Sequence, residues 1–201
     1  VGLIGTTGTK IMGRDVATEL TTPEAPMLQR LFAQMRDEGV THVVMEVSSH
    51  ALMLGRVTGS DFDVAAFTNL SQDHLDFHPT MEDYFQAKAL FFEPGSEMRA
   101  KRSVVCVDDE WGQRMAELAE APVTVATPSD AGITAELVRI DDQGRQRIQL
   151  TADDTYEFTL PMPGAFNVAN AALAAAIATT AGVELAPFLH GLEPVSYTHL
   201  T

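Results

Sequence analysis

The feature that most constrains this sequence is the alternation of short apolar runs with helix-like segments. Three apolar runs predict buried strands, at 41–47, 62–70 and 103–108. Helical patterns precede or separate them, at 23–38, 81–92 and 109–120. The run 123–127 predicts one more strand. Because strands that alternate with helices favour right-handed crossovers, we predict an α/β fold with a mainly parallel sheet flanked by helices.

The pattern changes after residue 132. Short alternating runs over 133–160, joined by the turn-like segments DDQG and ADD, predict a small antiparallel β appendage. An alanine-rich segment at 167–182 predicts a helix that ends at Gly182.

The charge balance excludes several classes of partner. The chain of 201 residues has 13 Lys and Arg against 28 Asp and Glu, for a net charge of −15. We therefore expect no nucleic-acid partner, and the sequence has no apolar run of membrane-spanning length. The single Cys106 lies in an apolar run and is expected in the core, which fits a reducing compartment.

The Gly-rich stretch GLIGTTGTK, residues 2–10, looks at first like a phosphate-binding loop. It does not fit the pattern G-x-x-x-x-G-K-[ST], since its glycines are too close together and Ile11 stands where a hydroxyl would bind Mg²⁺. We interpret this stretch as a turn after a strand.

Polar residues gather where the predicted strands end, which is where open parallel sheets bind ligands. Glu46 lies at the end of the first strand, followed by Ser48, Ser49 and His50. A carboxylate there commonly contacts nucleotide-bound Mg²⁺, although many strands also end in a solvated glutamate.

The second strand leads into TNLSQDHLDFH, residues 68–78, which contains Asp73, His74 and His78. A polar loop before a capped helix would explain an isolated histidine, and the H-E-x-x-H zinc arrangement is absent. For the whole cluster in this place we favour a site.

Lys88 is the third candidate. Aromatic residues lie three or four positions from it on the predicted helix face: Tyr84, Phe85, Phe91 and Phe92. A lone lysine among aromatics more commonly extends its amine to solvent, but a desolvated amine has a lowered pKa and reacts more readily.

Five segments occur in a characteristic order: LTTPEAP, MEVSSHAL, FTNLSQDHLDFH, MEDYFQAKALFF and GAFNVANAALA. Together they resemble the central, ATP-binding domain of the Mur ligases, specifically the MurE type, UDP-N-acetylmuramoyl-tripeptide synthetases. The resemblance covers residues 1 to about 194.

The resemblance implies an ATP-dependent amide ligase of bacterial peptidoglycan synthesis, acting with Mg²⁺ in the cytoplasm as a monomer. Its substrates would be UDP-MurNAc-L-Ala-D-Glu and a diamino acid, which could be L-lysine, ornithine or meso-diaminopimelate. ATP would phosphorylate the D-glutamyl carboxylate, and the amine of the diamino acid would attack the acyl phosphate.

Site residues are implied by the same resemblance. Glu46, His74 and a carbamylated Lys88 match the metal-binding and catalytic positions. The positions that match UDP-MurNAc-dipeptide binding are Thr21, Thr22, Ser48 and Arg56. Asn167 and Asn170 match the asparagine motif near the adenine of ATP.

The resemblance also implies a domain organisation. Residues 1–194 would be an incomplete central domain that lacks its first strand, its phosphate loop and its first helix. After GLEPV the family pattern stops, so residues 195–201 are expected to be a foreign tail.

Two alternatives remain open from the sequence. Another ligase of this superfamily, such as folylpolyglutamate synthetase, would share the metal-site lysine but not the EVSSHAL and TTPEAP segments. A metal-dependent phosphohydrolase would use Asp73, His74 and His78 and would hold a metal without ATP.

The first prediction concerns the 201-residue chain alone. Because backbone N–H groups and the lysine of a phosphate loop carry the phosphates of ATP, and residues 5–10 do not form such a loop, we expect no useful affinity for Mg-ATP. Calorimetry that detects micromolar binding would contradict this prediction.

Overall fold

The computed structural model describes residues 1–71, 78–127 and 130–194. They divide into two compact units, the first formed by the described residues of 1–61, 72–91 and 95–98. The second is formed by those of 62–71, 92–94 and 99–201. The expected foreign tail, residues 195–201, lies outside the described residues.

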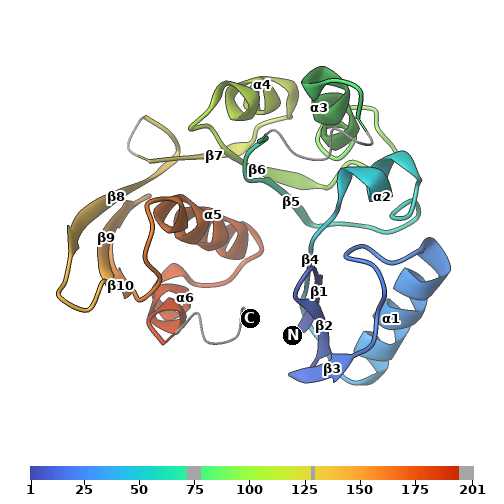
Figure 1. Ribbon diagram of the computed structural model, residues 1–201, viewed down its shortest axis with the longest axis horizontal. Helices are drawn as coiled ribbons and strands as arrows, with labels where there is room; N and C mark the ends of the chain where they lie inside the picture. The colour runs from blue at the N-terminus through green and yellow to red at the C-terminus, as the bar shows by residue number, and fades with distance from the viewer. Residues whose placement is uncertain (72–77, 128–129, 195–201) are drawn as a thin grey trace. The chain divides into compact units, whose positions relative to one another are not determined.

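The first unit contains a four-stranded sheet with the order β3–β2–β1–β4 (Figure 1). Its strands are β1 (Gly2–Gly5), β2 (Gly8–Ile11), β3 (Arg14–Val16) and β4 (Val43–Met45). β1, β2 and β3 are antiparallel neighbours, whereas β4 pairs in parallel with β1. The residues Thr6 and Thr7 form the turn between β1 and β2, which confirms that the GTTGTK stretch is a turn after a strand.

The burial predicted for the strand in 41–47 is wrong. Val43 is 41% exposed and Val44 57%, because β4 is the outer strand of its sheet and pairs only with β1 among the described strands. The strand itself is present. An apolar run predicts a strand, but it does not show whether a neighbouring element covers that strand.

Three helices complete the first unit: α1 (Ala25–Asp37), α2 (Ser49–Met53) and α3 (Met81–Ala89). The Ser48 hydroxyl caps α2 by accepting from the Ala51 N–H (3.2 Å), and the Thr80 hydroxyl caps α3 by accepting from the Asp83 N–H (3.1 Å). The sequence did not predict α2, since five residues are too few to show helical periodicity.

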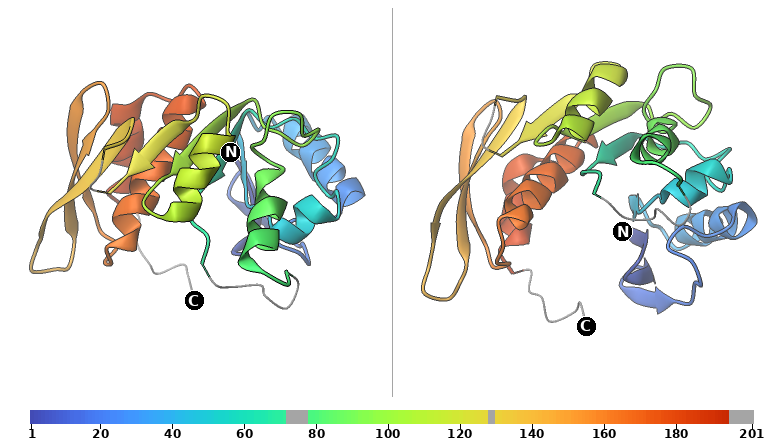
Figure 2. Two further views of the ribbon diagram at one scale, coloured as in Figure 1. Left: turned by 90° about the horizontal axis from the view of Figure 1, so that it is seen from above. Right: turned by 45° about the horizontal axis from the view of Figure 1, so that its top comes forward.

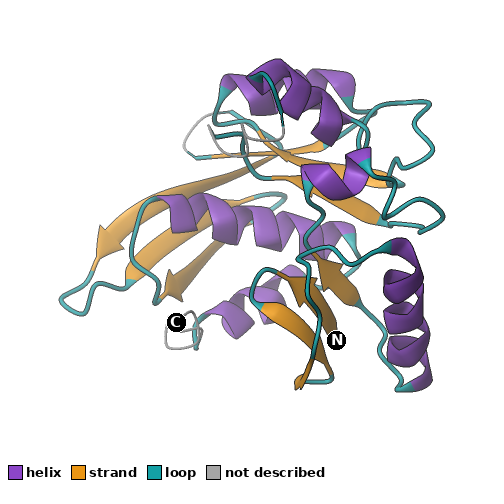
Figure 3. Ribbon diagram, turned by 45° about the vertical axis from the view of Figure 1, so that its right-hand side comes forward, coloured by secondary structure: helices purple, strands orange, loops and turns teal. Residues whose placement is uncertain are grey.

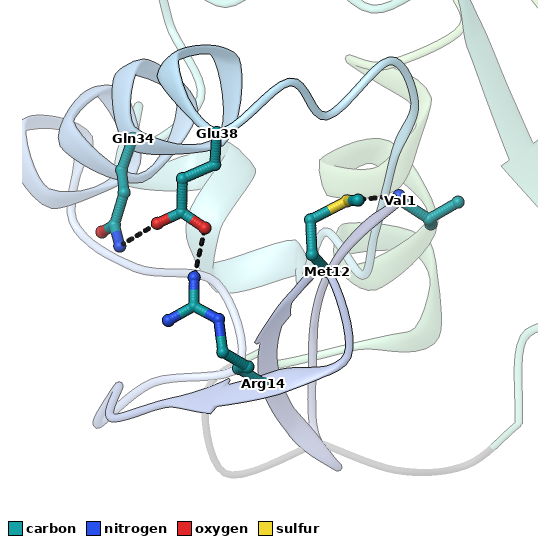
Figure 4. Close-up of polar contacts among 5 residues, drawn as sticks. All are labelled: Val1, Met12, Arg14, Gln34 and Glu38. Atoms are coloured by element: carbon teal, nitrogen blue, oxygen red, sulfur yellow. Dashed lines mark hydrogen bonds and ion pairs between the residues drawn. The ribbon is translucent and has the colours of Figure 1, made fainter.

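Side-chain contacts tie β3 to the end of α1 (Figure 4). Arg14 forms an ion pair with Glu38, whose other carboxylate oxygen accepts from the Gln34 amide (3.0 Å). The hydrogen bonds from Gln34 and Arg14 hold the pKa of the Glu38 carboxyl below its usual range. Nearby, the Val1 amino group donates to the Met12 sulfur (3.5 Å).

The second unit is built on a six-stranded sheet with the order β10–β9–β8–β7–β6–β5. Its strands are β5 (Val64–Phe67), β6 (Arg102–Cys106), β7 (Val123–Ala126), β8 (Ile133–Ile140), β9 (Gln146–Thr151) and β10 (Thr155–Leu160). The pairs from β5 to β8 are parallel, and those of β9 with β8 and β10 are antiparallel. The predicted α/β class, with its late antiparallel strands, is confirmed.

Helices cover both faces of this sheet: α4 (Glu110–Leu118) lies on one side, and α5 (Phe166–Thr180) lies on the other (Figures 1 and 2). α5 runs along the sheet beside the shorter α6 (Leu185–Leu192), as Figure 3 also shows. The buried face of α5 is largely alanine, at positions 171, 172, 175 and 176. These small side chains let the helix approach the strands closely and fill the core with backbone as well as side-chain atoms.

Cys106 is buried at the end of β6, as the sequence predicts, and burial raises the pKa of its thiol. Within the described residues, none of the helices combines the length and apolarity needed to cross a bilayer.

A single glycine sets how closely α4 approaches β6. A Cβ on Gly112 would lie 1.9 Å from the Cys106 carbonyl oxygen, which is backbone and cannot turn away. We expect Gly112→Ala to lower the free energy of unfolding by about 3 kcal/mol, in the range of severe overpacking.

Gly191→Ala is the matched control, because Gly191 is also helical and a Cβ there meets nothing within 4 Å. This variant should be unchanged or up to about 1 kcal/mol more stable, owing to the higher helix propensity of alanine. Urea unfolding measures both, and equal stabilities of the two variants would contradict the close approach of α4 to β6.

Candidate functional site

Glu46 follows β4 and is held beside β1. Its backbone N–H donates to the Ile4 carbonyl (2.9 Å), which extends the β1–β4 pairing by one bond. Its Oε1 accepts from the Thr6 backbone N–H (3.2 Å), and its Oε2 accepts from the Thr6 hydroxyl (2.5 Å). An exposed carboxylate with a defined orientation suits a hard divalent cation such as Mg²⁺, so Glu46 fits the predicted role.

Thr22 connects the segment that contains Glu46 to the segment before α1. Its hydroxyl donates to the Glu46 carbonyl (2.9 Å) and accepts from the Ser48 N–H (3.1 Å). The residue is only 1% exposed. Because this hydroxyl is buried and already engaged, Thr22 holds the 46–48 backbone in place, whereas the adjoining Thr21 is half-buried and closer to solvent.

Arg56 reinforces the same connection from the residues after α2. One guanidinium nitrogen donates to the Thr22 carbonyl (3.3 Å), and the other terminal nitrogen lies 2.8 Å from a Glu24 carboxylate oxygen. The third nitrogen, Nε, is buried with no hydrogen-bond partner among the described residues. The structure thus brings Arg56 and Thr22 together with Ser48.

A buried aromatic stack leads from the start of α2 to α3. The Nε2 atom of His78 lies 2.8 Å from the Ser49 hydroxyl, and the His78 ring stacks on Tyr84 with centroids 4.9 Å apart. His50 packs against His78 edge to face, at 5.9 Å. His78 is 3% exposed, so this histidine is a packed residue and not an open ligand.

Lys88 lies one helical turn beyond Tyr84, with its Nζ 5.2 Å from the Tyr84 ring centroid. Burial lowers the pKa of the Lys88 amine, because removal of water disfavours the charged form. The four aromatic residues predicted around this lysine are all buried. The amine of Lys88 is therefore partly desolvated, so its neutral form is less disfavoured than that of an exposed lysine.

His74 and Asp73, which the sequence singled out, lie outside the described residues. Among the residues that are described, no group of three or more His, Cys, Asp or Glu side chains is arranged to hold a metal ion. The oxygen of Glu46 and the amine of Lys88 are the described parts of the predicted metal site.

The predicted adenine-binding asparagines belong to the second unit, at the start of α5. The Asn167 amide donates to the Pro163 carbonyl (2.8 Å), and the Asn170 amide lies 3.5 Å from Asn167 Oδ1. Gln146 of β9 donates to both the Met162 and the Gly164 carbonyls (2.7 and 3.0 Å). The loop before α5 is thus held from two sides.

Sequence reasoning missed Thr6, His78 as a packing residue, and Gln146. Thr6 belongs to a stretch dismissed for its failed phosphate-loop spacing, and its distance of 40 residues from Glu46 gives no local signal. Gln146 is the first residue of β9, in which buried and half-buried residues alternate. Only this alternation could have indicated that the Gln146 side chain is buried.

Comparison with known proteins defines the class. Residues 1–178 match the Mur ligase middle domain. The chain belongs to this family.

The individual relatives are more specific. The chain is 61% identical over 199 residues to the UDP-N-acetylmuramoyl-L-alanyl-D-glutamate–2,6-diaminopimelate ligase of Corynebacterium glutamicum, covering 98% of this chain and 38% of that protein. It is 43% identical over 197 residues to the ligase of the same name from Bacillus licheniformis, covering 96% and 40%.

A solved structure of a ligase with this name superposes with a TM-score of 0.85 at 28% identity, covering 97% of this chain and 40% of that one. The chain therefore spans about 40% of the length of the relatives that it matches.

The geometry around Thr22 yields a stability prediction. Thr22→Val keeps the shape of the side chain but removes the hydroxyl that serves the Glu46 carbonyl and the Ser48 N–H, so we expect a loss of about 1–3 kcal/mol. Thr21→Val is the control, since the half-buried Thr21 should tolerate it within about 0.5 kcal/mol. Equal unfolding free energies for the two variants would show that the Thr22 bridge is not formed.

Proposed function

We propose that this chain is the middle part of an ATP-dependent amide ligase of peptidoglycan synthesis. The ligase adds 2,6-diaminopimelate to UDP-MurNAc-L-Ala-D-Glu, which is the reaction named for the relatives at 61% and 43% identity. The observation that supports the proposal is the environment of Lys88, which the resemblance matches to the carbamylated lysine of the family: its amine lies 5.2 Å from the Tyr84 ring centroid, and burial lowers its pKa.

Each group in this proposal has a chemical task. The lone pair of the neutral Lys88 amine attacks the carbon of CO₂, an N–C bond forms as the electron pair of one C=O π bond moves to oxygen, and a proton leaves the nitrogen to water to give a carbamate. Glu46, His74 and this carbamate would hold Mg²⁺, which when bound screens the phosphate charges and stabilises phosphoryl transfer. A carbamate on a lysine stem reaches further than the carboxylate of Glu or Asp, which is why a lysine is needed there.

Substrate binding is assigned to the segments that Thr22 and Arg56 hold together. Thr21 and Ser48 offer hydroxyls, and Arg56 offers a guanidinium suited to carboxylates and pyrophosphate. Asn167 and Asn170 would lie near the adenine of ATP. The phosphate loop itself is proposed to come from residues outside 1–201, since residues 5–10 are the end of β1, the turn at Thr6 and Thr7, and the start of β2.

The chemical order follows from bond-making. An oxygen of the D-glutamyl carboxylate attacks the terminal phosphorus of ATP and releases ADP. The neutral amine of diaminopimelate then attacks the acyl carbon, phosphate departs, and the nitrogen loses a proton to give the amide. We place this reaction in the bacterial cytoplasm, where ATP is supplied, with a monomeric enzyme.

The alternatives are less well supported. High identity to diaminopimelate ligases over 98% of the chain favours this activity over another ligase of the superfamily. The phosphohydrolase alternative used His78 as a metal ligand, but His78 is buried and bonded to Ser49.

Replacement of Lys88 tests the proposal in the full-length protein that contains this sequence. We expect Lys88→Ala to lower kcat by about 100-fold or more, as for loss of a group that stabilises transition-state charge. Millimolar short-chain carboxylic acids should restore part of the turnover by filling the place of the carbamate. Gln86→Ala, an exposed change on the same helix, is the control with unchanged activity.

Thermal melts of both variants separate chemistry from folding. A lysine that only packs would cost stability on removal and would not respond to added acid. Near-normal activity of Lys88→Ala without acid would rule out the metal-site role and with it the proposed mechanism.

A further inference from the structure

The Gly-rich turn that resembles a phosphate loop has a task of its own. We propose that Gly5 and Thr6 position the Glu46 carboxylate for a divalent cation, so that this turn is a supporting part of the metal site. The inference rests on the proposed function, which makes Glu46 a metal ligand, and assigns Thr6 as a positioning residue that does not itself contact the metal.

The Thr6 contacts define the plane of the carboxylate. The backbone N–H of Thr6 donates to Oε1 of Glu46 (3.2 Å), and the Thr6 hydroxyl donates to Oε2 (2.5 Å). Since each carboxylate oxygen accepts about two hydrogen bonds, one acceptor site on each oxygen remains for another partner. Two donors from one residue thus fix the orientation of the Glu46 carboxylate and leave acceptor sites on its oxygens for a metal ion.

Gly5 makes this arrangement possible by having no side chain. A Cβ at this position would lie 2.5 Å from Glu46 Oε1 and 3.0 Å from the carboxyl carbon. Gly5 does not have a positive φ, so its backbone would accept another residue, and its role is to permit close approach. By contrast, Gly8 adopts φ 103° and makes the turn itself.

The donors are neutral, which suits a metal ligand. Within the described part of the chain, Glu46 forms no ion pair with Lys or Arg. A cationic partner would compete with the metal ion for the carboxylate, whereas an N–H and an O–H orient it and leave its full negative charge. Hydrogen bonds of this kind to ligating carboxylates typically change metal affinity by about 10–100-fold.

The pairing of strands explains why the turn lies there. β1 and β4 run in parallel with Ile4 opposite Met45, so Gly5, the last residue of β1, and Glu46, the first residue after β4, lie side by side. The spacing of this turn differs from that of a phosphate loop because Gly5 and the Thr6 hydroxyl contact Glu46 beside the neighbouring strand and do not bind a nucleotide.

The test measures metal affinity directly in the full-length protein. Mn²⁺ is titrated and the loss of the free-ion electron paramagnetic resonance signal is recorded for the wild type and for Glu46→Gln, Thr6→Val, Thr6→Ser and Gly5→Ala. Thr7→Val is the matched control, since Thr7 is the other exposed threonine of the same turn, whereas the hydrogen bonds to the Glu46 carboxylate come from Thr6. The Mg²⁺ concentration for half-maximal ligase activity gives a second readout, and thermal melts confirm folding.

We expect Thr6→Val to weaken Mn²⁺ binding by about tenfold, and Gly5→Ala to weaken it at least as much by displacing the carboxylate. Thr6→Ser should stay within about twofold of the wild type because it keeps the hydroxyl, and Thr7→Val should be unchanged. This pattern would not arise from a general loss of turn stability, which would affect positions 6 and 7 alike.

Two contrary results are distinguishable. If Glu46→Gln weakens Mn²⁺ binding but Thr6→Val and Gly5→Ala match Thr7→Val, the positioning role is wrong and the proposed function stands. If Glu46→Gln itself binds Mn²⁺ like the wild type, Glu46 is not a ligand and both assignments are overturned.

Discussion

The parallel pairing of β1 with β4 is the constraint on which the first unit depends. Its register places Ile4 opposite Met45, and this brings the β1–β2 turn next to Glu46. A slip by one residue would turn the side chains of β4 to the opposite face of the sheet and would break the contacts that orient the carboxylate. The Thr22 hydroxyl then holds the backbone on both sides of Val47, so the same pairing also positions Ser48 and the start of α2.

The second unit depends on close approach between backbones. Gly112 lets α4 rest on the Cys106 carbonyl, and the alanines of α5 let that helix lie along the opposite face of the sheet. Gln146 ties the loop before α5 to the sheet by two hydrogen bonds, which gives the neighbouring Asn167 a defined position at the helix start. The candidate nucleotide-binding residues thus follow a loop that hydrogen bonds hold to the sheet.

At Lys88, packing changes the acid–base properties of an ordinary side chain. Its pKa falls because water is removed from the amine, and the Tyr84 ring beside it is held by His78, which is bonded to Ser49. A lysine on an exposed helix face would keep water around its amine, and its pKa would stay near the ordinary value. These contacts are the physical basis for the role proposed for Lys88.

The sequence by itself determined the α/β class, the order of the main elements and the membership of the family. Hydrophobic periodicity and the order of motifs can be recognised along the chain without knowledge of the tertiary structure. The resemblance also implied the site residues, and the structure places Thr22 in hydrogen bonds with Glu46, Ser48 and Arg56. The exposure of β4, the short helix α2 and the task of Thr6 were decided only by the tertiary structure. Each depends on which distant backbone lies alongside, and a partner 40 residues away, as Thr6 is from Glu46, leaves no trace in local spacing.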